Sequence, residues 1–147
     1  MKKEYQVSTS NKRKSFFINK YDMDELNQLL EISLKALFNR MKKHKLRDIK
    51  LPFIIHLNDL NIDIIINFYS RKFAFNFSNR CLRINNINNL YDEFVYLATE
   101  SFVFGDWLSG KAHFDNLAIS CLLNWYRKTI NNRYPRELYD ALNFFHV

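Results

Sequence analysis

One stretch of the sequence has the spacing of a phosphate-binding loop. Gly105 and Gly110 are five positions apart and Lys111 follows, as in loops whose main-chain N–H groups surround nucleotide phosphates. That chemistry also needs a Ser or Thr after the lysine to hold magnesium, and this chain has Ala112 there. Trp107, inside the stretch, continues an apolar helical stripe. The pattern therefore indicates a helix rather than a nucleotide site.

The other reactive side chains form no recognisable catalytic or metal-binding group. Cys81 and Cys121 are forty positions apart without a CxxC motif, which favours a reducing, cytoplasmic compartment. The aspartates are scattered and suggest no carboxylate pair. We expect a protein that is not an enzyme, with no cofactor and no metal, although an enzyme of unrecognised type stays an alternative. The four histidines lack the spacing of metal ligands: His44, His56, His113 and His146.

The basic residues are the next candidates for a binding function, since the formal net charge is +7. They gather in the N-terminal arm, in the segment 40–50 and in the segment 127–136. Such segments attract the phosphates of lipid headgroups or of nucleic acid, and they can also be plain solvated surface. We expect four of them, at an exposed helix end, to contact a membrane surface or a headgroup: Arg40, Lys42, Lys43 and Lys45.

The composition predicts one domain over residues 21–147 behind a flexible basic arm over residues 1–20. Hydrophobic residues make up 48% of the chain, which is enough to build a core. The arm lacks the apolar segment of a signal peptide, and no window approaches the roughly 20 apolar residues of a membrane span. We therefore expect a soluble protein that touches a membrane without crossing it.

Hydrophobic periodicity predicts the elements that position these side chains. Apolar residues recur at intervals of three and four from Leu26 to Met41, after acidic residues that suit a helix N-terminus. Four runs then alternate with a period of two, which predicts an antiparallel meander: residues 53–57, 62–68, 73–77 and 82–84. The later pattern predicts helices over 90–98, 102–108, 117–130 and 136–145, and one strand over 110–114.

These elements predict an α+β fold, with a single five-stranded, antiparallel-rich sheet and helices packed mainly on one face. Three phenylalanines occupy one face of the third strand, since side chains two apart point the same way. A packed core and the lining of an apolar cavity bury the same face, so both interpretations stay open. The lining of such a lipid-binding cavity would be Ile64, Ile66, Phe73, Phe75, Phe77, Phe94, Leu97, Phe102 and Leu108.

Five segments follow one another over residues 22–131: 27–40, 51–62, 92–98, 104–108 and 110–111. Taken in this order, they resemble the sterol carrier protein family. The match departs from the family at Asn116 and Leu117, where a Gly-Asp pair is usual. Asn adopts the left-handed turn that Gly adopts, but the acidic side chain is lost. The matching segments are 27–40, which resembles the entry helix; 51–62, which resembles the first strand and turn and includes His56; and 92–98, 104–108 and 110–111, which resemble a helix-helix-strand passage.

The resemblance implies a non-enzymatic carrier that holds a fatty, sterol or isoprenoid molecule in a tunnel between sheet and helices. Bacterial members that are accessory factors in ubiquinone biosynthesis imply a narrower role. That role is the presentation of a lipid or polyprenylated quinone precursor to ubiquinone-biosynthesis enzymes, at the anionic surface of the inner membrane. No nucleic acid is expected on this interpretation. The alternative is a small basic protein that binds nucleic acid or a protein partner, although no RNA-recognition pattern is present.

Overall fold

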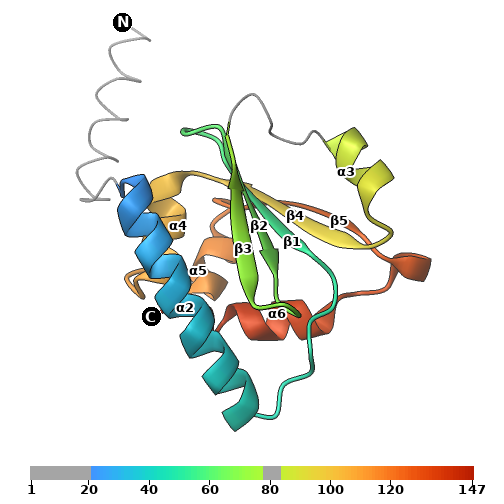
Figure 1. Ribbon diagram of the computed structural model, residues 1–147, viewed down its shortest axis with the longest axis horizontal. Coiled ribbons are helices and arrows are strands. Elements are labelled where there is room, and N and C mark those ends of the chain that lie inside the picture. The colour runs from blue at the N-terminus through green and yellow to red at the C-terminus, as the bar shows by residue number, and fades with distance from the viewer. Residues whose placement is uncertain (1–20, 78–83) are drawn as a thin grey trace, which may run out of the picture.

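The computed structural model describes residues 21–77 and 84–147 and contains one open, mixed sheet (Figure 1). The sheet has five strands in the order β3-β2-β1-β4-β5. The strands are β1 (Phe53–Leu57), β2 (Ile62–Asn67), β3 (Lys72–Asn76), β4 (Phe94–Thr99) and β5 (Asn124–Lys128). The helices are α2 (Met23–Lys43), α3 (Ile84–Leu90), α4 (Ser101–Leu108), α5 (Phe114–Ile119) and α6 (Arg136–Leu142), with a short 3₁₀ helix, η2 (Ile130–Asn132). The predicted arm over 1–20 lies outside the described residues.

Helices α2, α4, α5 and α6 pack on one face of the sheet, and α3 lies on the other (Figure 1). The large core forms beneath the four helices, where Phe53, Ile55 and Leu57 of β1 are completely buried. A small second cluster joins Ile54 and Phe94 to Ile87 of α3 on the opposite face. The α+β class and the five-stranded sheet with helices mainly on one face are confirmed.

The sheet is antiparallel-rich but mixed. Strand β1 is antiparallel to β2 and parallel to β4, while β2–β3 and β4–β5 are antiparallel. A parallel neighbour requires the chain to cross over the sheet between the two strands. The described helix α3 belongs to the connection from β3 to β4, on the face opposite to the other helices. The predicted four-strand meander therefore stops after β3.

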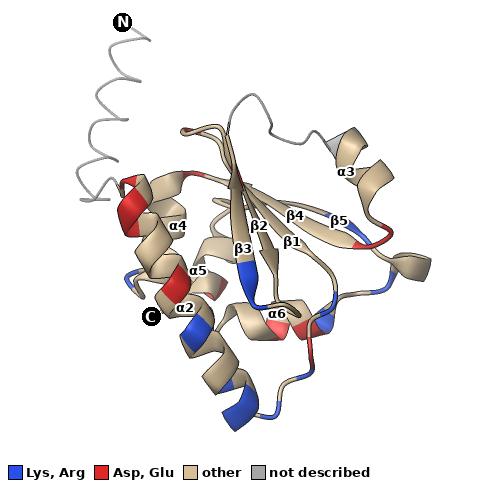
Figure 2. Ribbon diagram, viewed as in Figure 1, with Lys and Arg blue, Asp and Glu red and all other residues tan. Residues whose placement is uncertain are grey.

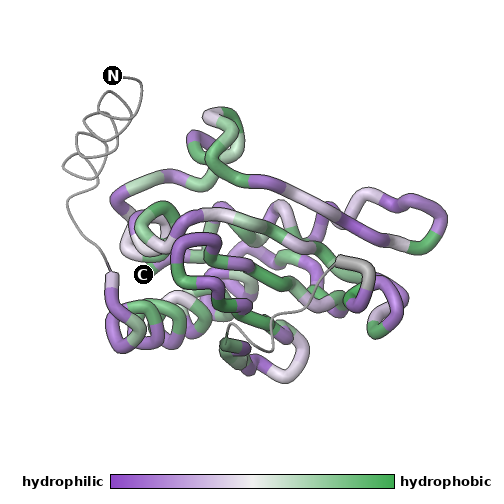
Figure 3. The backbone as a smooth tube through the Cα atoms, turned by 90° about the horizontal axis from the view of Figure 1, so that it is seen from above, coloured by the Kyte–Doolittle hydropathy of each residue, from purple (hydrophilic) through white to green (hydrophobic). Residues whose placement is uncertain are grey.

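Helix α2 forms as the sequence predicts. The side chain of Asp22 caps it by accepting the main-chain N–H of Glu25 at 2.8 Å, which satisfies one free donor of the first turn. Apolar and polar residues alternate along its turns (Figure 3), as in an amphipathic helix. Its buried stripe consists of Leu26, Leu30, Ser33, Leu34, Leu37 and Met41.

The stretch with phosphate-loop spacing is a packed helix. Gly105 lies inside α4, and a Cβ atom at that position would be only 2.1 Å from the Tyr21 ring. The absence of a side chain thus lets Tyr21 pack onto α4, where its hydroxyl donates to Asp106 Oδ1 at 2.7 Å. Glycine is required at this position by close approach between α4 and the segment that precedes α2.

The predicted helix over 90–98 is wrong, because residues 94–99 form β4 in the middle of the sheet. Phe94 is buried on one face of the sheet while Val95 and Leu97 are buried on the other. A central strand covered on both faces has few polar positions to mark an alternation of two. The continuous apolar run was therefore consistent with a helix.

Three more predicted elements differ from the structure. The strand expected over 82–84 has its first residues outside the described part, and residue 84 begins α3. Residues 110–112 form a turn, with Gly110 at φ +82°, and the next helix starts at Phe114. The helix expected over 117–130 ends at Ile119, because Cys121 has left-handed backbone, and β5 follows. Only Trp125 of this edge strand packs against the main core, so no alternation marks it.

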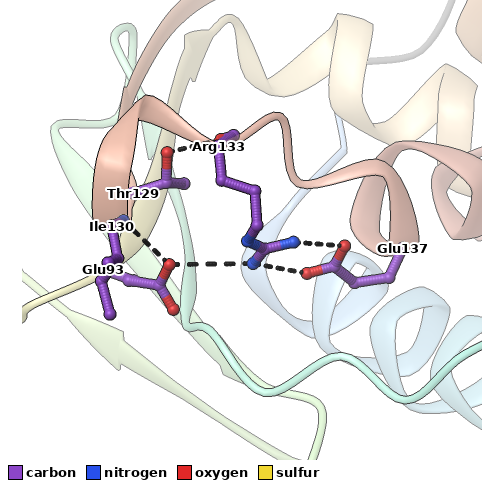
Figure 4. A network of polar contacts seen from close by, with 5 residues as sticks. All are labelled: Glu93, Thr129, Ile130, Arg133 and Glu137. Atoms are coloured by element: carbon purple, nitrogen blue, oxygen red, sulfur yellow. Dashed lines mark hydrogen bonds and ion pairs between the residues drawn. The ribbon is translucent and has the colours of Figure 1, made fainter.

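A polar network attaches the segment after β5 to the start of β4 and to α6 (Figure 4). Both terminal nitrogens of Arg133 donate to the Glu137 carboxylate at 2.9 Å, and Glu93 accepts the main-chain N–H of Ile130 at 3.0 Å. Burial acts to raise the pKa of Glu137, but the Arg133 hydrogen bonds, a main-chain hydrogen bond and the charges of Arg133 and Arg47 together outweigh it, so this pKa is lower than usual. The paired charges stabilise the fold while Glu137 is ionised.

Replacing Arg133 by Met should lower the free energy of unfolding at pH 7 by about 0.5–1 kcal/mol. Because the pKa of Glu137 is lowered in the folded protein, this stabilisation is complete at pH values above the ordinary pKa of 4.5. It is lost as the pH falls through the lower pKa that Glu137 has in the folded protein. Urea unfolding of parent and variant at pH 7 and at about pH 2–3 measures both differences. If the variant were less stable than the parent by the same amount at both pH values, the Arg133–Glu137 ion pair would not be the source of the stabilisation.

Candidate functional site

Two adjoining hollows form a groove between α2 and the β2–β3 hairpin, named here the α2–β3 groove. They have volumes of about 510 and 420 Å³ and share the side chains of Phe38 and Arg71. The larger hollow is lined by Glu31, Leu34, Lys35, Phe38, Asn39, Arg71 and Phe73. The smaller is lined by Phe38, Met41, Lys42, Lys45, Leu46, Asp48, Ile49, Phe68, Tyr69 and Arg71. Both volumes are in the range of small-ligand sites.

An apolar floor and a charged rim distinguish the α2–β3 groove. Leu34 and Phe38 are one helical turn apart on α2, so both face the same neighbour, and Phe73 approaches from β3. The guanidinium of Arg71 lies 4.6 Å from the centre of the Phe38 ring, which is a cation–π contact. Arg71 therefore stands between the two hollows and lines both of them.

The backbone at the end of α2 places Lys45 on the rim. The N–H of Leu46 donates to the Met41 carbonyl at 2.9 Å, and the N–H of Lys45 donates to the Lys42 carbonyl at 3.3 Å. This pair of bonds is a Schellman motif, which ends a helix with a left-handed residue. Lys45 occupies that position with φ 53°, where glycine is the usual residue. A lysine here costs backbone energy and supplies a charge to the groove.

Charge is divided along α2. Acidic residues occupy its first turn, and Arg40, Lys42 and Lys43 occupy its last. Figure 2 shows basic segments on the C-terminal half of α2 and at the start of β3, where Lys72 follows Arg71. The rim of the groove thus carries four cations and two carboxylates: Lys35, Lys42, Lys45 and Arg71, with Glu31 and Asp48. This rim has a net positive charge beside an apolar floor.

The structure brings most of the predicted lining residues to one face of the sheet. Ile64 pairs with Phe75 and Ile66 with Phe73 across the β2–β3 register. Ile64, Ile66, Leu97 and Leu108 have no exposed surface and belong to the main core. Phe73, Phe75 and Phe102 are partly buried against that core. Of the nine predicted residues, Phe73 is the one that lines a hollow of the groove.

Phe94 and Phe77 depart from the predicted lining. Phe94 belongs to the small cluster beneath α3, on the face away from the other residues, because β4 is a strand whose neighbours alternate between faces. Phe77 follows β3 and is 57% exposed. Phe38 and Arg71 were not predicted as site residues. Their contact joins a helix to a turn, and only the amphipathic stripe of α2 pointed to Phe38.

The four basic residues predicted to touch a membrane lie in three different environments. Arg40 donates to the main-chain oxygens of Phe144 at 2.9 Å, His146 at 2.5 Å and Val147 at 3.2 Å. These bonds hold the segment after α6 against α2. Lys42 and Lys45 line the groove, while Lys43 is exposed at the end of the helix.

Two polar clusters lie outside the groove. Asp59 accepts the main-chain N–H of Ser101 at 2.8 Å and also its hydroxyl, so it caps the start of α4 from the β1–β2 turn. Burial, then the neighbouring charge of Asp59, raises the pKa of Glu100. On the face of α3, the Nδ1 atom of His56 lies 2.7 Å from Oδ1 of the fully buried Asp63. Each cluster is satisfied internally, and both contribute to the fold.

Within residues 21–77 and 84–147, no group of three His, Cys, Asp or Glu side chains is arranged to hold a metal ion. None of the helices in those ranges has the length and apolar character that a membrane span requires. Comparisons with protein-family models, with curated proteins and with solved structures find no match for this chain. The resemblance to the sterol carrier protein family stays a prediction.

Replacing Arg40 by Met should cost about 1–2 kcal/mol of unfolding free energy, because three main-chain oxygens lose a charged donor. The matched change Lys43→Met, at an exposed lysine of the same basic segment that lines neither hollow, should cost less than about 0.5 kcal/mol. Urea denaturation at pH 7 measures both values. Equal values for the two variants would mean that Arg40 is ordinary surface.

Proposed function

We propose that this chain binds an amphipathic lipid in the α2–β3 groove and presents it without catalysing a reaction on it. The supporting observation is the combination of the apolar floor at Leu34, Phe38 and Phe73 with the cations on the rim. An acyl or isoprenoid chain matches such a floor, and an anionic headgroup matches the rim. The ligand would lie along the edge of the sheet, beside α2.

A phospholipid fits this groove better than an uncharged quinone precursor. Both ligands supply an apolar chain for the floor, but a phosphate also pairs with Lys42, Lys45 and Arg71. A polyprenylated quinone precursor would use the floor and leave the cations to an anionic membrane surface. The role in ubiquinone biosynthesis, at the cytoplasmic side of the inner membrane, follows from the family resemblance and is proposed on that basis.

Binding of nucleic acid is less well supported by the same residues. A nucleic-acid backbone presents a continuous row of phosphates and favours an uninterrupted row of cations. In the groove, Glu31 and Asp48 stand among the cations and would repel such a row. A single headgroup needs only two or three cations, which the groove provides beside Arg71.

Replacing Lys45 by Gly should raise the stability of the fold and weaken vesicle binding. Glycine suits the left-handed backbone at this position, so the free energy of unfolding should rise by about 0.5–1 kcal/mol. The same change removes a rim cation, which should weaken binding to vesicles of 30% phosphatidylglycerol in phosphatidylcholine by about fivefold. Thermal melting and vesicle co-sedimentation at low salt measure the two effects.

Two control variants accompany Lys45→Gly. Asn132→Gly relieves another left-handed position, with φ 56°, without changing charge, and should leave vesicle binding unchanged. Arg136→Gln removes an exposed charge outside the groove and should change vesicle binding much less than Lys45→Gly. Vesicle binding by Lys45→Gly that equals that of the parent would show that the rim only keeps the protein in solution.

Replacing Phe73 by Ala should reduce the amount of lipid that the protein retains. Phe73 is partly buried at the edge of the core, so the variant should stay folded while the floor of the larger hollow loses its β3 side. Native mass spectrometry of the proteins, after incubation with a single phosphatidylglycerol species, measures the fraction that carries one lipid. Phe102→Ala, which removes a partly buried ring outside the groove, is the matched control. An unloaded parent protein would overturn the proposed function.

A further inference from the structure

Another hollow, of about 400 Å³, lies between α5, β5 and α6, outside the α2–β3 groove, and has a different chemical lining. Its walls are aromatic rings from four places in the chain: Phe114, Trp125, Tyr134 and Tyr139. The Trp125 ring centre is 5.9 Å from that of Phe114 and 5.5 Å from that of Tyr139, with both pairs edge to face. The rings of Tyr134 and Tyr139 are 4.8 Å apart.

The charged groups that line this hollow are carboxylates. Asp115 lies on its rim, exposed and without an ion-pair partner among the residues that the structure describes. Asp140 also lines it and shares its charge with Arg136, whose Nε is 3.6 Å from Oδ2. Oδ1 of Asn143 is buried with no hydrogen-bond partner in the described part of the chain. That oxygen has almost no accessible surface, so the carboxylates of Asp115 and Asp140 are the charged acceptors that a ligand in the hollow can reach.

The ring faces and the carboxylates favour the same ligand chemistry. Aromatic faces attract cations through the ring quadrupole, and the carboxylates add Coulomb attraction. Carboxylate oxygens also accept hydrogen bonds, which favours a cation that carries N–H donors. We propose that this hollow binds a protonated amine on an apolar stem, with the ammonium at the carboxylates of Asp115 and Asp140 and the stem against the rings.

Arg127 supports the cation preference of these rings. Its guanidinium carbon lies 5.3 Å from the centre of the Tyr134 ring, so one face of the cluster already holds a cation of the chain itself. Burial raises the pKa of Tyr139, which outweighs the opposing effect of Arg127, so its phenol is neutral at pH 7. The net charge of +7 repels cations at long range. The affinity therefore depends on contacts inside the hollow rather than on steering.

This site is independent of the proposed lipid groove. The two share no lining residue, and they adjoin β5 and β3, which are the opposite edges of the sheet. A variant that loses ligand binding at one site should keep ligand binding at the other site. Failure of one proposal is therefore distinguishable from failure of the other.

The test uses three probes of five non-hydrogen atoms each: n-butylammonium, tetramethylammonium and butan-1-ol. Titration of the full chain, followed by ¹H–¹⁵N NMR, should give a saturable shift of the Trp125 indole N–H with n-butylammonium. Butan-1-ol should bind at least about tenfold more weakly, since it lacks the charge. Tetramethylammonium should be intermediate, because it keeps the cation–π attraction and lacks the N–H donor.

Two variants locate the site. Tyr134→Ala, at a side chain that is 57% exposed, should weaken n-butylammonium binding about fivefold or more, while Tyr69→Ala, at a ring 77% exposed elsewhere, should not. Asp115→Asn should weaken it severalfold, while Asp24→Asn on α2 should leave it unchanged. Equal binding of butan-1-ol and n-butylammonium would mean an apolar hollow without cation preference. That outcome, no saturable shift, or unchanged binding in Tyr134→Ala would each overturn the proposal.

Discussion

The structure depends on the double pairing of β1, which is antiparallel to β2 and parallel to β4 at the centre of the sheet. Phe53, Ile55 and Leu57 face the four-helix side with no exposed surface, and Ile54 is equally buried on the other side. A shift of β1 by one residue would turn every one of its side chains to the opposite face of the sheet, so the residues packed in the two cores would be exchanged. The register of β1 therefore positions both its neighbours and the helices above them.

The central pairing also determines which strands remain at the edges. Strand β3 ends one side of the sheet and β5 the other, and each contributes an aromatic residue to a neighbouring hollow. The hollow at β3 is rimmed mainly by cations, whereas the hollow at β5 is lined by aromatic rings and carboxylates. One sheet thus separates two sites of opposite electrostatic character, although the whole chain is strongly basic.

Local patterns predicted the parts of the fold in which burial has one clear face. The stripe from Leu26 to Met41 and the alternation through β1, β2 and β3 belong to this group. Strand β4 was not predictable in this way, because Phe94 and Val95 are buried on opposite faces and no polar residue marks the period. Of the groove, the sequence pointed to Lys42, Lys45 and Phe73. It did not predict the meeting of Phe38 with Arg71, since tertiary packing alone brings α2 to the β2–β3 turn.

The position of β3 has a consequence for self-association. Beyond β3 the sheet has no further strand in the part of the chain that the structure describes, and its charged positions, Arg71 and Lys72, lie at one end only. An edge strand of this kind is a template for strand addition by a second copy. A lipid bound in the proposed groove, against Phe73, would obstruct that addition. If lipid binding occurs as proposed, occupancy of the groove would then change the tendency of the protein to self-associate.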